Sequence, residues 1–296
     1  MRLHAPQGRT SRRDPAIQGP SRWSRSAAPD FGARLAYHMG DCVNAPLNPA
    51  YNSCVLLLGC RLRDLGLDSA MNTPKSRDCK PDVRLYAIVD PARAGGRGLP
   101  DLASFVAGGG ATLVQLRDKH GDTRAMIEAA RTIKAKLTPF GVPLLINDRV
   151  DVALAAGADG VHLGQDDMTI ADARRLLAGD GVIGLSVKTL AQAEAAPVDL
   201  LDYAAIGGVF ATTSKNNPDP PVGIEGLRAI AQVFRRRRPD LPLCAIAGID
   251  ATNAGAVIAA GVDGVALISA LSLASNPENA ARDLRAVIDG ALAAKA

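Results

Sequence analysis

The sequence predicts an α/β protein whose regular part is a (β/α)8 barrel of the TIM type. Eight short apolar runs follow one another after Pro81, amphipathic stretches with helical spacing separate them, and residues 155–161 recur almost unchanged as residues 259–265. In both copies a glycine ends a helix just before the next strand. An open, doubly wound sheet is the alternative. The three consecutive glycines at residues 108–110 precede a predicted strand, however, whereas the glycine loop that binds a dinucleotide follows a strand.

The eight predicted strands are short, and glycine, aspartate, asparagine or serine follows each within two residues. In chain order they are Leu85–Val89, Thr112–Leu116, Pro143–Ile146, Gly160–Leu163, Val182–Leu185, Tyr203–Ile206, Leu243–Ala247 and Gly264–Ile268. Helical spacing of apolar residues is clearest in Thr123–Leu137, and the helix Ile224–Arg237 ends before Pro239. Residues 81–296 are long enough for a compact barrel, which needs about 200 residues.

The first 80 residues differ in composition from the rest of the chain. They hold 12 Lys+Arg, 6 Asp+Glu, no Glu, the only Trp and four of the five Cys, and they show no sustained periodicity. We predict a disordered basic extension over residues 1–80 and a folded domain over residues 81–296. Met71 lies ten residues before Pro81. We therefore expect residues 1–70 to be dispensable and Met71 to be the native start.

Composition also excludes several classes of protein. No apolar run approaches the roughly 20 residues of a membrane-spanning helix. The early cysteines show neither Cys-x-x-Cys spacing nor a paired histidine, so we expect reduced thiols and a cytoplasmic protein rather than a zinc site. The basic run Arg235–Arg238 ends a predicted helix, and we interpret it as a favourable helix terminus rather than a nucleic-acid contact.

Polar side chains follow the predicted strands at the end where such barrels carry their functional residues. Arg117 and Lys119 follow the second strand, and Lys215 follows the sixth; together they can surround several phosphate oxygens. Asp148 and one residue of the pair Asp166–Asp167 can hold a hard divalent cation. Mg²⁺ commonly binds through one or two carboxylates together with substrate phosphates, so this pattern predicts a diphosphate substrate.

Other polar positions allow a second, smaller phosphate site. Gly248 and Ser269 follow the seventh and eighth strands, where barrels often surround a single phosphate with backbone N–H groups. Asp148 and Asp167, each taken alone, are equally well explained as helix caps. His162 lies inside an apolar run, and we expect a hydrogen-bonded barrel residue rather than a ligand there.

Four segments closely resemble the thiamine-phosphate synthase family: Gln115–Lys119, Leu145–Ala153, Gly160–Asp167 and Gly184–Ser186. The resemblance covers roughly residues 84–275 and does not extend to residues 1–80. It implies a barrel transferase that joins 4-amino-2-methyl-5-pyrimidinylmethyl diphosphate to 4-methyl-5-(2-phosphoethyl)thiazole. The products are thiamine phosphate and diphosphate, and one Mg²⁺ per subunit is expected.

The resemblance also implies roles for individual residues. The pyrimidine diphosphate would be surrounded by Gln115, Leu116, Arg117, Asp118, Lys119, Asn147, Ser186 and Lys215, of which Arg117, Lys119, Ser186 and Lys215 would be catalytic. The thiazole phosphate would be held by Thr212, Thr213, Ser214, Gly248, Ile268 and Ser269. The Mg²⁺ ligands would be Asp148 and Asp167. The chain departs from the family pattern at Ala211, Ser214 and Ala247, where the family has proline, threonine and glycine.

Two other functions remain as alternatives. A thiazole tautomerase-like paralogue would share the barrel without needing the residues for metal and diphosphate. A non-catalytic ligand-binding regulator would need no catalytic positions at all. The presence of Asp148, Asp167, Arg117, Lys119 and Lys215 argues against both. The expected partners are the two small-molecule substrates, with no nucleic acid and no membrane, and homo-oligomerisation is left open.

Overall fold

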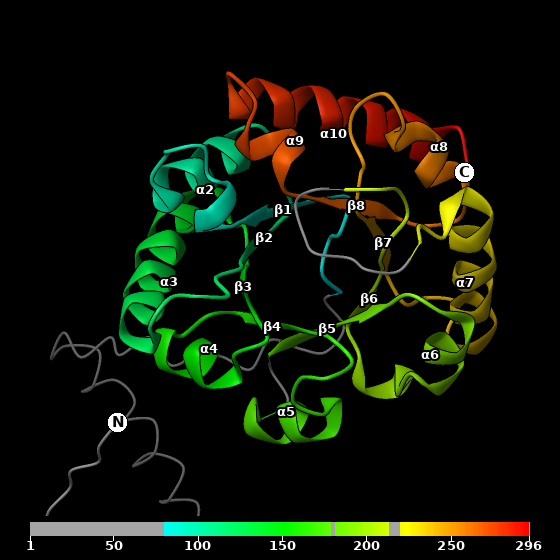
Figure 1. Ribbon diagram of the computed structural model, residues 1–296, viewed down its shortest axis with the longest axis horizontal. Helices are drawn as coiled ribbons and strands as arrows, with labels where there is room; N and C mark the ends of the chain where they lie inside the picture. The colour runs from blue at the N-terminus through cyan, green and yellow to red at the C-terminus, as the bar shows by residue number, and fades with distance from the viewer. Residues whose placement is uncertain (1–79, 179–180, 213–219, 296) are drawn as a thin grey trace, which may run out of the picture. The chain divides into compact units, whose positions relative to one another are not determined.

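The computed structural model describes residues 80–178, 181–212 and 220–295, so the predicted extension lies outside the described residues except for Lys80. Eight parallel strands form a closed barrel in chain order, which confirms the predicted fold and excludes the open sheet (Figure 1). The strands are β1 (Leu85–Val89), β2 (Leu113–Leu116), β3 (Leu144–Asn147), β4 (Gly160–Leu163), β5 (Val182–Val187), β6 (Tyr203–Ile206), β7 (Leu243–Ile246) and β8 (Gly264–Leu267). Pairing of Leu85 with Val265 closes the barrel between β1 and β8.

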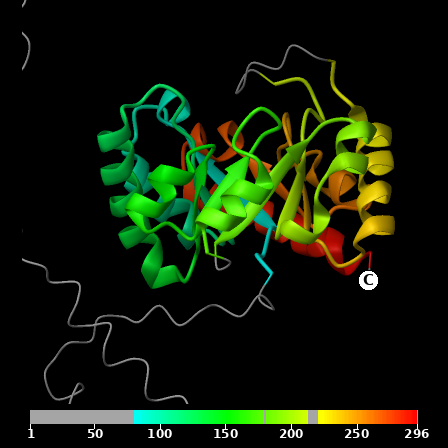
Figure 2. The same ribbon diagram turned by 90° about the horizontal axis from the view of Figure 1, so that it is seen from below.

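Helices surround the strands on the outside, as the side view shows (Figure 2). They are α2 (Leu99–Gly108), α3 (Thr123–Leu137), α4 (Val150–Ala156), α5 (Ile170–Leu176), α6 (Leu190–Ala195), α7 (Gly223–Arg237), α8 (Ala254–Ala259), α9 (Ser269–Ser272) and α10 (Pro277–Ala293). Three 3₁₀ turns add η1 (Pro91–Arg93), η2 (Thr138–Phe140) and η3 (Val198–Leu200). Among the described helices, none has the length and apolar character needed to cross a membrane.

Alternation along each strand divides the core into two parts. On β1, Tyr86 and Ile88 belong to a small cluster of buried side chains inside the barrel. Leu85, Ala87 and Val89 belong to the large cluster between the barrel and its helices. Side chains that face inward near the C-terminal ends of the strands are therefore the ones that can reach a pocket there.

A repeated aspartate joins neighbouring strands at the opposite, N-terminal end of the barrel. Asp159, Asp202 and Asp263 directly precede β4, β6 and β8. Their carboxylates accept hydrogen bonds of 2.9, 2.7 and 2.9 Å from the backbone N–H groups of Leu144, Ile183 and Leu243. Each also pairs with a basic side chain of an outer helix, namely Lys134, Arg174 and Arg235. The recurrence of residues 155–161 as 259–265 reflects this arrangement, since the two segments contain the first and third of these aspartates.

Replacement of Asp202 by alanine tests this structural role. The Arg174 guanidinium is only 14% exposed, and the variant removes its carboxylate partner together with the acceptor of the Ile183 N–H. We expect the free energy of unfolding to fall by about 2–4 kcal/mol, measured by urea denaturation. The matched control is Asp199→Ala at an exposed position, for which a change within about 0.5 kcal/mol is expected. Equal stability of the two variants would contradict the assigned role.

The basic run at the end of α7 binds neighbouring parts of the barrel. Arg235 pairs with Asp263 at 2.6 Å. Arg237 donates to the carbonyl oxygens of Ala193 and Ala196, and Arg238 donates to those of Val198 and Leu201. Arg237 and Arg238 therefore connect the end of α7 to α6 and to the segment between α6 and β6, and Arg235 connects it to the residue before β8.

Candidate active site

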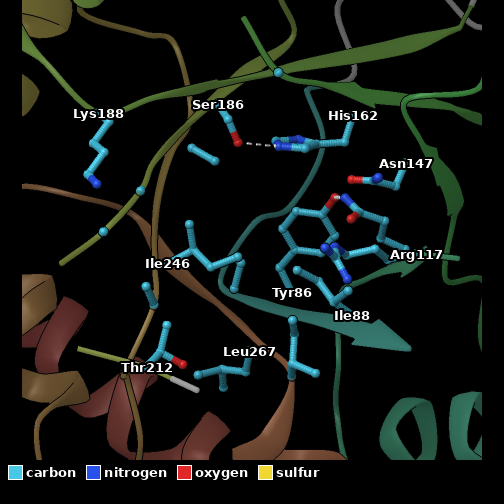
Figure 3. A pocket seen from close by; sticks show the side chains of 18 of the residues that line it. Tyr86, Ile88, Arg117, Asn147, His162, Ser186, Lys188, Thr212, Ile246 and Leu267 are labelled. Carbon is cyan, nitrogen blue, oxygen red and sulfur yellow. Dashed lines mark hydrogen bonds between the residues drawn. The ribbon is translucent and has the colours of Figure 1, made fainter. Parts of the chain in front are cut away.

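A cavity of about 1010 Å³ opens at the C-terminal ends of the strands. Side chains from β1 to β8 and from the segments that follow them line it (Figure 3). Strands β2 to β5 and the segments after them carry Arg117, Lys119, Asn147, Asp148, Asp167 and Ser186, and the segments after β6 to β8, on the other side of the barrel, carry Thr212, Gly248, Ile268 and Ser269. Lys188, which follows β5, adds another basic side chain to the lining. The barrel thus gathers residues from positions 86 to 270 into one pocket.

A buried carboxylate holds Arg117 in place. The Arg117 guanidinium, which is 15% exposed, forms an ion pair with Asp90, which is 3% exposed. The other Asp90 oxygen accepts a hydrogen bond of 2.9 Å from the Ala92 N–H at the start of η1. Asp90 could not be recognised as a site residue from the sequence, because a single aspartate after a strand is equally expected as a helix cap, a role that it also has here.

Asp148 lies between a basic residue and a second carboxylate. Its backbone has φ = 62°, in the left-handed region, and its N–H donates to the His162 carbonyl at 2.9 Å. Its carboxylate forms an ion pair with Lys119. Burial raises the pKa of the Asp148 carboxyl, the Lys119 ammonium opposes this shift, and the adjacent Asp167 carboxyl raises the pKa further. The two carboxyl groups are therefore close enough to interact directly.

This arrangement fits a hard divalent cation. Asp167 is positioned by a hydrogen bond of 2.7 Å from the Gly164 N–H to its Oδ2. Two adjacent carboxylates repel each other unless a cation lies between them. Within residues 80–178, 181–212 and 220–295, no group of three or more His, Cys, Asp or Glu side chains could hold a metal. A cation at Asp148 and Asp167 would take its remaining ligands from substrate and water, which is usual for Mg²⁺.

Asn147 and Ser186 present polar groups to the same side of the pocket. Among the described residues, Asn147 Nδ2 is buried without a hydrogen-bond partner, so a bound acceptor would satisfy it. Ser186 Oγ lies 2.7 Å from His162 Nε2, and the Ser186 carbonyl accepts a bond of 2.7 Å from Gln165 Nε2. His162 is thus a hydrogen-bonded barrel residue, as expected from its position.

The backbone after β7 has an unusual conformation on the other side of the pocket. Gly248 has φ = 67°, and a Cβ atom there would lie 2.6 Å from the Ala211 carbonyl oxygen and from Phe210 Cβ. Glycine is therefore required. Ala247 has φ = 96°, which costs an L-residue about 1–2 kcal/mol. This alanine stands where the family has glycine, so the chain keeps the left-handed backbone in spite of the substitution.

The structure places some predicted residues elsewhere. Leu116 packs in the outer core, because strand alternation directs it away from the side of Gln115 and Arg117. Asp118 accepts hydrogen bonds from the His120 and Gly121 N–H groups and does not line the pocket. Of the predicted segment Gln115–Lys119, the structure therefore brings Gln115, Arg117 and Lys119 to the pocket, and the side chains of Leu116 and Asp118 lie elsewhere. Thr213, Ser214 and Lys215 lie outside the described residues.

Comparison with known proteins identifies the family. Residues 85–271 match the sequence model of thiamine monophosphate synthase. The thiamine-phosphate synthase of Agrobacterium fabrum is 56% identical over 216 residues, covering 73% of this chain and 98% of that protein. That of Chloroflexus aurantiacus is 46% identical over 207 residues, covering 70% and 93%. A solved thiamine phosphate pyrophosphorylase from Pyrococcus furiosus superposes with a TM-score of 0.63 at 35% identity, covering 72% of this chain and 98% of that one. The chain therefore belongs to the thiamine-phosphate synthase family of transferases.

Proposed function

We propose that this protein condenses 4-amino-2-methyl-5-pyrimidinylmethyl diphosphate with 4-methyl-5-(2-phosphoethyl)thiazole, forming thiamine phosphate and releasing diphosphate. The observation that carries this proposal is the presence, in one pocket, of the adjacent carboxylates of Asp148 and Asp167 together with the basic side chains of Arg117 and Lys119. Such a site suits a diphosphate that arrives with a divalent cation. The Gly248 backbone and Ser269 lie on the opposite side, where a single phosphate fits.

The reaction exchanges one bond for another. The C–O bond between the pyrimidine methylene and the diphosphate breaks, and the diphosphate leaves with the electron pair. The electron-rich aminopyrimidine stabilises the positive charge on the methylene carbon, and the thiazole nitrogen then attacks that carbon to form the C–N bond. Because this nitrogen has a lone pair and no proton to lose, the step needs no general base.

The pocket residues act on the leaving group and on orientation. Arg117 and Lys119 would stabilise the negative charge that develops on the departing diphosphate, and Asn147 Nδ2 and Ser186 Oγ would orient it. Lys215 is proposed for the same group, and Thr212, Thr213, Ser214, Gly248, Ile268 and Ser269 for the thiazole phosphate. Asp148 and Asp167 would hold one Mg²⁺, which when bound supplies positive charge to the leaving diphosphate.

Phosphorus NMR of turnover mixtures tests the proposal. The purified protein is incubated with Mg²⁺ and either substrate alone, or with both substrates together. We expect thiamine phosphate and diphosphate resonances only in the complete mixture. If folded protein leaves both substrates unchanged, the synthase function is wrong.

We propose that residues 81–296 are the catalytic domain and that residues 1–70 are not needed for turnover. The family match over residues 85–271 supports this division, as does the coverage of 98% of the Agrobacterium fabrum protein by 216 residues of this chain. A chain that lacks residues 1–70 is expected to keep the kcat and KM of the full chain in the same assay. Loss of activity on this deletion, in a chain that still folds, would show that the extension contributes.

We further propose a cytoplasmic location, with the two small molecules as the partners. Cys244 is a free thiol in the interior of the barrel, which suits a reducing compartment.

A further inference from the structure

A chain of hydrogen-bonded side chains crosses the interior of the barrel and ends at Ser186. Its members, Gln115, Tyr86, Tyr203, His162 and Ser186, come from five different strands. The two tyrosine hydroxyls are 2.9 Å apart, and the Tyr203 hydroxyl lies 2.7 Å from His162 Nδ1. Figure 3 shows the last contact, in which the Ser186 hydroxyl points at the His162 ring at 2.7 Å from Nε2. Branched apolar side chains usually fill the interior of such a barrel. A series of hydrogen-bonded polar side chains in their place suggests a functional role.

Close packing holds the chain in place. Tyr203 is fully buried, and a Cβ atom at Gly184 of the neighbouring strand would lie 2.0 Å from its Cζ. The glycine therefore makes room for the tyrosine ring. The His162 ring stacks on Tyr203 with ring centroids 5.6 Å apart, and Tyr86 meets Tyr203 edge to face at 5.7 Å. Two aromatic contacts and a dedicated glycine thus set the distances between the polar atoms.

The position of each proton in this series of hydrogen bonds can be assigned in turn, starting from Gln115. Burial raises the pKa of both tyrosine hydroxyls far above the ordinary value, so each keeps its single proton. Gln115 Nε2 can only donate, and its partner is the Tyr86 oxygen. Among the described residues, the Tyr203 oxygen is the hydrogen-bond partner left to accept the Tyr86 proton, and the Tyr203 proton is then directed to His162 Nδ1. This ring nitrogen must therefore carry the lone pair.

We propose that His162 is a positioning residue: as the neutral tautomer with its proton on Nε2, it donates to Ser186 Oγ and so directs the Ser186 proton at the substrate. The identity of the substrate atom rests on the proposed function. Diphosphate oxygens accept hydrogen bonds and never donate them, so a hydroxyl donor matches them. The other tautomer would accept the Ser186 proton at Nε2 and present an oxygen lone pair to the same anion.

Nitrogen NMR of the full chain, labelled with ¹⁵N at histidine, reads the tautomer directly. The signals of His162 are identified by their absence from the His162→Gln variant. If that variant does not fold, a chain with the other three histidines replaced gives the same assignment. We expect a pyrrole-type Nε2 and a pyridine-type Nδ1. A proton on Nδ1 would overturn the proposal. Because this NMR measurement needs no substrate, a wrong tautomer assignment can be distinguished from a failure of the proposed synthase function.

A double-mutant cycle tests the link to catalysis. Tyr203→Phe removes the donor to Nδ1 without changing a residue that lines the pocket. We expect kcat to fall about 10-fold with an unchanged KM for the pyrimidine diphosphate. In a Ser186→Ala background the same substitution should have no further effect on kcat, since the proton to be directed is gone. Equal losses in both backgrounds would contradict the proposal, because a merely structural role does not depend on Ser186.

The control for this cycle is Leu113→Val, another substitution of a buried residue inside the barrel that does not line the pocket. Leu113→Val should not change kcat, whether it is introduced into the unchanged protein or into the Ser186→Ala variant. Thermal unfolding of each variant shows that the comparison is made on folded protein. If Tyr203→Phe does not fold, Tyr86→Phe interrupts the chain one bond earlier and is expected to show the same dependence on Ser186.

Discussion

Replacing Asp148 by asparagine is expected to lower kcat by about 100- to 1,000-fold at a Mg²⁺ concentration that saturates the unchanged protein. The amide keeps an oxygen but loses the negative charge that would hold the cation next to Asp167. Asparagine is chosen over alanine because the backbone at this position has φ = 62°, a conformation that asparagine tolerates well. The fall in kcat should therefore reflect weaker binding of the cation rather than a disturbed fold. Steady-state rates measured across a Mg²⁺ titration check this, and the half-saturating concentration should rise.

The adjacent Asp166 provides the control for this substitution. Asp166 is exposed, whereas Asp167 accepts the Gly164 N–H and interacts with Asp148. We expect Asp166→Asn to change kcat only slightly and Asp167→Asn to resemble Asp148→Asn. Near-normal rates for Asp148→Asn at low Mg²⁺ would remove Asp148 from the metal site.

Replacing Arg117 by alanine is expected to lower kcat/KM for the pyrimidine diphosphate by about 100-fold or more, because a charge aimed at the leaving group is lost. Lysine should restore little, since a single ammonium cannot reproduce the planar donor set of a guanidinium. The substitution also leaves Asp90, only 3% exposed, without its cation. Removing one partner of such a pair costs about 3–5 kcal/mol, so urea denaturation must accompany the kinetics.

A double variant separates stability from catalysis at this pair. Asp90→Asn combined with Arg117→Met removes both charges and should recover most of the lost stability. Activity should stay low, because the guanidinium is still absent. A double variant that turns over at the rate of the unchanged protein would show that Arg117 acts only on the fold.

The barrel could be predicted from the sequence almost residue by residue. Each of the eight strands overlaps its predicted apolar run, with ends that differ by at most two residues. The differences have local causes. Thr112 does not extend β2, because its hydroxyl accepts the Leu85 N–H at 3.1 Å in the place that aspartates occupy before β4, β6 and β8. Ala247 does not extend β7, because φ = 96° turns the chain away from the strand.

The position of the pocket could be predicted, because the C-terminal ends of the strands meet at one face of any such barrel, whatever the sequence of the individual loops. Most of the predicted residues line the cavity for this reason. A contiguous motif does not distinguish inward from outward side chains, so Leu116 and Asp118 were predicted together with Gln115 and Arg117 although their side chains do not line the cavity. The alternation that places Gln115 and Arg117 on one side of β2 identifies them only when the strand is known.

The supporting contacts could not be predicted from local patterns. Asp90 directly follows β1 and Arg117 directly follows β2, with α2 between them in the sequence, so only the pairing of β1 with β2 brings them together. Tyr86 and Tyr203 lie 117 positions apart in sequence and touch across the interior. Each appears in the sequence as an ordinary aromatic residue of an apolar run. Their hydrogen bonds to Gln115 and His162 depend on the relative register of the four strands that carry these residues.

The most direct test of the account is the Mg²⁺ dependence of product formation by the purified full chain. Both substrates are supplied, with Mg²⁺ or with a chelator in its place, and thiamine phosphate and diphosphate are measured in the same samples. We predict one diphosphate for each thiamine phosphate in the presence of Mg²⁺ and almost none with the chelator. Equal product formation in the two samples, or no product from folded protein with Mg²⁺, would contradict the account.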